Sequence, residues 1–170
     1  LSRNDSDKPH DVLASKEIGR TTSVSTATGE TWSEPASAYN ATYPYNHVRE
    51  TESGHIKEFD DTSGNERIHE YHKSGTFYEV QPDGTKVTRV VGENYTIVAK
   101  GNDVNIKGNC NLTIDQNCTT YIKGNWDIKV DGNKTETVQG TVTETFAKTQ
   151  NTTAGGDITI VGGPNINLNP

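Results

Sequence analysis

From Gly84 to Gly163 the sequence repeats every eight residues without an insertion. The seventh position of successive octads holds a β-branched or aromatic residue, whereas Thr, Asn, Asp and Lys fill most of the rest. The seventh-position residues are Val90, Val98, Ile106, Ile114, Ile122, Val130, Val138 and Phe146. The first position is most often glycine, at Gly84, Gly92, Gly108, Gly124, Gly132, Gly140 and Gly156. Self-similarity at a fixed period predicts a stacked architecture.

An even period keeps the same side of a strand apolar in every repeat. Side chains alternate faces along a strand, so positions 1, 3, 5 and 7 share one face and the even positions share the other. The odd face carries the seventh-position residues, often with Leu112, Ile128, Val104 or Trp126, and we predict that it points inward. The first-position glycines are predicted to be corners, where a permissive backbone is needed.

One octad cannot stabilise itself. It buries about one good apolar side chain, worth ~1.5–3 kcal/mol, and ordering eight backbone units costs several times more. One possible closure winds three octads of a single chain into each turn of a solenoid. Alternatively, three chains each contribute one face per turn, which leaves no lateral sheet edge open. We favour the second closure, so the predicted fold is all-β: a homotrimeric, triple-stranded β-helix shaped as a triangular prism.

The rest of the chain is predicted to form three further segments. Residues 1–53 are rich in Ser, Thr, Ala and Pro and are predicted to be an extended linker whose isolated aromatics dock on a partner surface that the sequence does not identify. Residues 54–91 alternate short strand-like runs with "TSGN", "SG" and "PDG", which predicts an antiparallel β-meander. The octad helix is placed at 84–163, and residues 164–170 form a C-terminal tip.

Charge and hydropathy exclude several classes of function. A formal net charge of −7 makes nucleic acid and anionic membrane surfaces poor partners. The chain has no apolar run of the length that a membrane-spanning helix needs, and no signal peptide opens it. It contains no Met and begins at Leu1, so we expect a processed product or an excerpt of a longer protein.

Several polar residues were weighed as sites, and none is predicted to be catalytic or metal-binding. His69 and His72 lie three apart on a strand and therefore face opposite ways. The pair Asp60–Asp61 is better explained by a turn. Cys110 and Cys118 lie one octad apart; reduced thiols are the favoured interpretation, with a ligand pair or an interchain bridge as the alternative.

The inward face also carries polar groups, but no cofactor is predicted to be required. Cys110, Cys118, Asn94 and Lys134 would face the lumen, where they can enclose water or ions.

The octads, of the type V-x-G-N-x-T-x-x, follow "SGHIKEFDDTSGNERIHEYHKSGTFYEVQPDGTKVTRVVGENY". Together with "YNATYPYNHVRETESGH" and "GGPNINLNP", they resemble the C-terminal β-helical needle of T4-like phage baseplate central spike (tail-associated lysozyme) proteins. The sequence is similar, more distantly, to the VgrG spikes of type VI secretion. The resemblance implies a homotrimeric cell-puncturing needle that pierces the host outer membrane when the tail sheath contracts.

The same resemblance implies partners and a location. A baseplate hub and an upstream lysozyme domain would lie at the N-terminal end, and a PAAR-repeat tip protein would bind the other end. The implied tip contacts are Gly163, Pro164, Asn165, Ile166 and Asn167. The protein would assemble in the host cytoplasm, reside in the virion tail baseplate and reach the host periplasm on infection.

Nothing in residues 1–170 resembles the lysozyme, so this chain is predicted not to be an enzyme. The C-terminus also lacks the H-x-H pair with which some related spikes bind iron. Two alternative functions remain: a VgrG-like secretion spike, and a tailspike rod that binds or cleaves glycans. Against cleavage, Glu136 and Glu144 lie on the predicted inward face, where a substrate cleft cannot form.

Overall fold

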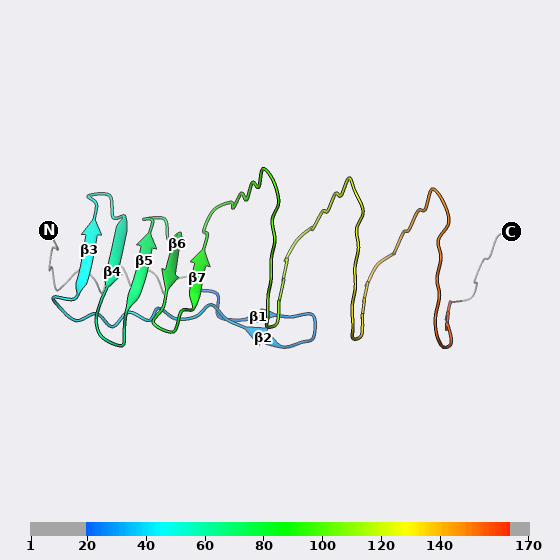
Figure 1. The fold of residues 1–170 in the computed structure, drawn as a ribbon, viewed down its shortest axis with the longest axis horizontal. Coiled ribbons are helices and arrows are strands. Elements are labelled where there is room, and N and C mark those ends of the chain that lie inside the picture. The colour runs from blue at the N-terminus through cyan, green and yellow to red at the C-terminus, as the bar shows by residue number, and fades with distance from the viewer. Residues whose placement is uncertain (1–19, 164–170) are drawn as a thin grey trace. The chain divides into compact units, whose positions relative to one another are not determined.

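The computed structural model describes residues 20–163, in which all regular structure is β. A short hairpin pairs β1 (Val24–Ser25) with β2 (Thr31–Trp32). A five-stranded antiparallel sheet follows in chain order: β3 (Asn46–Glu50), β4 (Ile56–Asp60), β5 (Arg67–Tyr71), β6 (Phe77–Val80) and β7 (Lys86–Arg89) (Figure 1). The predicted all-β class is confirmed. The chain divides into two compact units, whose described parts are residues 20–119 and 120–163.

Three tight turns of one kind build the sheet. They have the sequences "ESG", "KSG" and "PDG", and each ends in a glycine with a positive φ: Gly54 at 88°, Gly75 at 95° and Gly84 at 83°. In each turn the glycine N–H donates to the carbonyl three residues earlier, as from Gly84 to Gln81 at 2.9 Å. Only glycine adopts this left-handed conformation without strain, so the turns fix the strand register.

Gly84 therefore corrects one sequence prediction. It was assigned as a corner of the octad helix, but it closes the β6–β7 turn, and the first octad supplies strand β7. The seventh-position residue of that octad, Val90, is 39% exposed, while Val87 is buried in the sheet. The reason is the neighbouring "PDG" turn, which returns this octad to β6 before the bends begin.

The sheet also begins earlier than the predicted meander at residue 54. Strand β3 lies within the predicted linker and pairs with β4 over its full length, from Asn46 opposite Asp60 to Glu50 opposite Ile56. Its sequence, "NHVRE", carries one apolar residue, half-buried Val48. A strand that depends on its ladder rather than on an apolar face leaves little periodic signal.

The inner face of the sheet is half apolar and half charged. Tyr71, Phe77 and Val87 form a small buried core with Ile56 packed against it. Beside this core lies a group that we call the Arg67 cluster: Arg67, Glu58, Glu79 and His69, all buried. The Arg67 guanidinium donates to Glu58 and, at 2.7 Å, to Glu79, and its side chain has no exposed surface. A buried cation between two carboxylates satisfies the rule that buried charges are paired.

The N-terminal segment covers this charged half. The Tyr39 ring lies 5.0 Å from the Arg67 guanidinium, and the Ala38 N–H and Ser37 hydroxyl donate to Glu79 at 3.3 and 3.1 Å. The predicted docking of the linker aromatics thus holds for Tyr39. Tyr43 and Tyr45, by contrast, are each more than half exposed.

Opposing effects act on the Glu58 carboxyl. Burial raises its pKa, but the hydrogen bond with His69 and the charge and hydrogen bond of Arg67 outweigh burial and hold the pKa below the usual 4.5. Because the folded pKa is lowered, the Glu58 interactions stabilise the sheet fully above the unfolded pKa. That contribution is lost as the pH falls through the folded value.

Replacing Arg67 should destabilise the sheet strongly. Arg67→Ala leaves two buried carboxylates without a counter-charge, which typically costs about 3–5 kcal/mol. The measurement is the unfolding midpoint of the full chain by circular dichroism. Lys57→Ala is the matched control, since Lys57 pairs with Glu70 on the solvated face and its loss should hardly move the midpoint. Equal effects of the two variants would contradict the assignment of the cluster.

The pH dependence of the same midpoint should follow Glu58. We expect a plateau around neutral pH and a decline below pH 4.5. Glu58→Gln should lower the plateau and make the acid decline shallower, because the titrating group is gone. Melting curves from neutral pH down to acid test this, and an unchanged slope in the variant would exclude Glu58 as the group responsible.

Candidate assembly surface

Beyond the sheet the backbone bends once in every octad. Bends occur at residues 91–92, 99–100, 107–108, 115–116, 123–124, 131–132, 139–140, 147–148 and 155–156. Each bend takes the eighth position of one octad and the first of the next, and the six residues between bends run without one. The period read from the sequence is therefore the period of the backbone path in both units.

The first-position glycines lie at these bends, but not for the reason that we expected. Gly92, Gly108, Gly124, Gly132, Gly140 and Gly156 all have ordinary φ values, and Lys100, Gln116 and Lys148 occupy equivalent bends. The bend thus does not require a left-handed residue. A Cβ added at any of these glycines would meet no atom within 4 Å in the same chain. Any need for a small residue at a corner must therefore arise from atoms outside the chain.

The seventh-position side chains are half exposed. From Val98 to Phe146 their exposure ranges from 43% to 53%, whereas apolar residues at the fourth and sixth positions, such as Ile97 and Tyr121, are 78% to 90% exposed. A side chain on the inner side of a bend is shielded by both arms of the chain, so this contrast agrees with an inward seventh position. We call this row of seven residues the seam.

The seam is not the only apolar feature of the odd positions. It continues into further exposed apolar side chains at the third and fifth positions, among them Val104, Leu112, Trp126 and Ile128. Exposed apolar side chains that recur at fixed positions within each unit are candidates for an interaction surface.

The backbone of the octads after the first is also unpaired within the chain. Within residues 92–163 no strand ladder forms, and none of the backbone hydrogen bonds of the described chain joins two residues of this range. Extended segments with free N–H and C=O groups are templates for pairing with another chain. The seam and the unpaired backbone together make residues 92–163 a candidate assembly surface.

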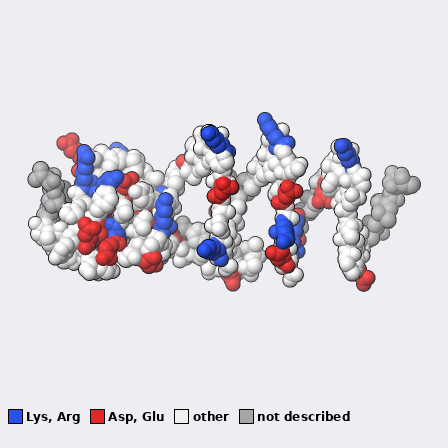
Figure 2. All heavy atoms as spheres, viewed as in Figure 1, with Lys and Arg blue, Asp and Glu red and all other residues white. Residues whose placement is uncertain are grey.

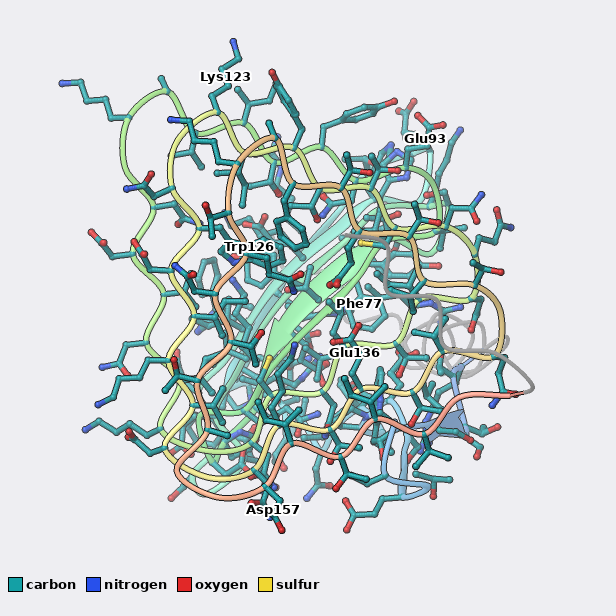
Figure 3. The ribbon with its side chains drawn as sticks, turned by 90° about the vertical axis from the view of Figure 1, so that its right-hand side faces the viewer. Phe77, Glu93, Lys123, Trp126, Glu136 and Asp157 are labelled. Atoms are coloured by element: carbon teal, nitrogen blue, oxygen red, sulfur yellow. The ribbon has the colours of Figure 1, made fainter. Side chains whose placement is uncertain are left out.

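Charged side chains of unit 2 lie on both predicted faces. Lys123, at a bend, and Asp157, just after one, occupy even positions and point away from the ribbon (Figure 3). Lys134 and Glu136, at odd positions, form an ion pair at 2.9 Å. The hydrogen bond to Glu136 and its charge, together with that of Glu144, raise the pKa of Lys134. If the odd positions point inward, the interior contains a layer of charged side chains as well as layers of apolar side chains.

The remaining candidate residues separate as the strand pattern predicted. His69 is buried, whereas His72 is exposed and lies 4.4 Å from the His55 ring. Asp60 is buried and accepts the Thr62 N–H in the β4–β5 turn, while Asp61 is exposed. Cys110 and Cys118 are exposed free thiols. Between residues 20 and 163, no group of three or more His, Cys, Asp or Glu could hold a metal ion.

Two features of unit 1 were missed at the sequence level. The Arg67 cluster had a usable signal, since Glu58, Arg67, His69 and Glu79 occupy strand positions that alternate in phase with Tyr71 and Phe77. The second feature is a contact between the β1–β2 hairpin and the octads, where the Thr113 hydroxyl donates to the Ser25 carbonyl at 3.0 Å. No sequence signal links residues so far apart.

The predicted tip lies largely outside the described residues. Gly163 is described and exposed, whereas Pro164, Asn165, Ile166 and Asn167 fall beyond residue 163. No helix among residues 20–163 is long and apolar enough to cross a membrane.

Comparison with known proteins finds similarity to two phage proteins. The chain is 48% identical to Protein Gp5 of Vibrio phage KVP40 over 111 residues, which are 63% of this chain and 26% of that protein. It is 51% identical to the pre-baseplate central spike protein Gp5 of Enterobacteria phage T4 over 70 residues, 41% of this chain and 12% of that protein. No protein-family model matches.

These relatives confirm the resemblance to T4-like baseplate central spike proteins that the octads predicted. The matched region spans about a quarter of the Vibrio phage protein and about an eighth of the T4 protein.

A pair of adjacent residues tests which face points inward. Ile122→Asp should weaken assembly, because it removes ~1.5–3 kcal/mol of apolar burial per chain and brings charges together in one layer. Tyr121→Asp is the matched control, since Tyr121 lies at the sixth position and is 82% exposed. Size-exclusion chromatography and melting curves give the readout. Assembly of the Ile122 variant at the parental stability would refute the inward assignment of the seam.

Proposed function

We propose that this chain is the structural needle of a contractile phage tail baseplate, acting as a homotrimer. The observation that carries the proposal is the seam of residues 92–163, half exposed on a backbone with no partner in its own chain. The relatives in two phages, one of them a central spike protein by name, support a phage baseplate over the alternatives of a secretion spike or a glycan-cleaving rod.

Three chains would bury the seam and pair the free backbone groups of the octads at the same time. If the octads form the three sides of a triangular path, each chain returns to the same side only after three octads. Strands of two sister chains then fill the interval on that side and pair with its free N–H and C=O groups at a spacing of ~4.8 Å. Within unit 2, open space separates the successive passes of the chain, as this arrangement requires (Figures 1 and 2).

The predicted mechanism is mechanical. An axial push is resisted because a one-residue slip of any strand would turn its whole inner row toward solvent. The even positions present Thr, Asn, Asp and Lys to water, and Figure 2 shows acidic and basic side chains interspersed along unit 2. A surface of this kind lacks the large exposed apolar patches that would hold a needle in a membrane. The needle would pierce the host outer membrane on sheath contraction without chemistry of its own.

The ends of the needle are assigned partners in the same proposal. A baseplate hub and a lysozyme domain of a longer polypeptide would lie on the N-terminal side, and a PAAR-repeat tip protein would bind at the C-terminal end. The chain itself would not be an enzyme, and no nucleic acid or cofactor would bind. Its place would be the virion tail, with passage through the periplasm on infection.

The mass of the assembly tests the proposal directly. Sedimentation equilibrium of the purified chain should give three times its 18.6 kDa, unchanged on dilution. The trimer should also resist dissociation by SDS without heating, since separating the chains breaks all the octad ladders together. A folded monomer would overturn the proposal, and a dimer would overturn the three-sided closure.

A further inference from the structure

We infer that Cys110 of each chain stacks against the partner's Cys118, forming three identical thiol pairs that can close the assembly covalently. This inference rests on the proposed trimer. The sequence contains two cysteines, and they lie in adjacent octads.

The backbone places the two thiols at one register position. Cys110 is the third residue of the octad that begins at the bend of residues 107–108, and Cys118 is the third residue of the octad that begins at the bend of residues 115–116. Both are odd positions on the face of the seam. Within one chain a bend separates them, so they lie on different sides of the path and remain free thiols.

Threefold closure brings them together between chains. Each chain advances by one side per octad, so on every side the octad of residues 108–115 is followed along the axis by residues 116–123 of a sister chain. Bends stack on bends, and third positions therefore stack on third positions. Neighbouring strands lie ~4.8 Å apart, which falls inside the ~4.4–6.8 Å range of Cα separations that a disulfide bridges.

The bond would form by exchange with a small-molecule disulfide such as oxidised glutathione. One cysteine thiolate attacks a glutathione sulfur, giving a mixed disulfide and one glutathione thiolate. The second cysteine thiolate then displaces the bound glutathione, so two cysteines are oxidised and one oxidised glutathione becomes two reduced ones, which take up the two protons. Because each chain carries one partner of two different pairs, three bonds link all three chains into a closed ring.

The experiment expresses the full chain in a host with an oxidising cytoplasm, so that the thiols meet oxidant before the lumen closes. After alkylation and boiling in SDS without reductant, we expect a covalent trimer that dithiothreitol converts to monomer. The double variant Cys110→Ser/Cys118→Ser is the control for complete dissociation by heat. Peptide mapping of trimers mixed from ¹⁴N and ¹⁵N chains should find Cys110–Cys118 links that join light to heavy peptides.

The single variants separate this register from others. Cys110→Ser and Cys118→Ser should each run as monomers on the denaturing gel while keeping the native trimer mass. Covalent dimers in either variant would mean that like cysteines meet across the axis, which overturns the stacked pairing. A native trimer without bonds in the parent overturns this inference alone, whereas a native monomer overturns the proposed trimer together with it.

Discussion

The proposed assembly depends on a backbone ladder that residues 92–163 do not form within their own chain. In residues 92–163 the chain bends with a strict period, exposes half of every seam side chain and pairs none of its backbone groups with one another. Backbone groups that become buried need partners, and a single apolar side chain per octad cannot offset the entropy of ordering eight residues. In the proposed trimer, the fold of this region would be a property of the assembly, with each chain supplying one third of every layer.

The five-stranded sheet pairs its own backbone but lacks a large apolar core. It completes its ladders within one chain, yet it encloses few apolar residues and stabilises the charged half of its inner face by placing Arg67 between Glu58 and Glu79. Residues 36–42 cover that half, so the N-terminal segment is part of the sheet's structure and not a free tether. A self-contained platform of this kind can order the start of each octad segment before the chains associate, because β7 ends where the bends begin.

The structural features that could be predicted from the sequence are those with a local sequence pattern. The octad period, the all-β class and the strands β4–β7 follow from alternation and from the turns "SG" and "PDG", which are local features. Strand β3 was missed because Val48 is its single apolar residue, and the contact of Thr113 with Ser25 was missed because it joins distant positions. The corner glycines were located correctly at the bends but explained wrongly, since a demand for φ > 0 cannot be told from a demand for space by sequence alone. Gly84 is the exception that does need a positive φ, and it belongs to a turn of the sheet.

The bends hold either glycine or a longer side chain, as at Lys100, Gln116 and Lys148. This tolerance affects how the number of octads can change over evolutionary time. In a threefold prism, inserting or deleting one octad turns everything beyond it by a third of a revolution, which the symmetry renders indistinguishable from the original. Length can thus be adjusted in steps of a single repeat with both ends left in the same relation to their neighbours. If the chain is the proposed needle, its reach through a thicker or thinner cell envelope would be set by the number of octads, which can change by recombination between similar stretches of gene.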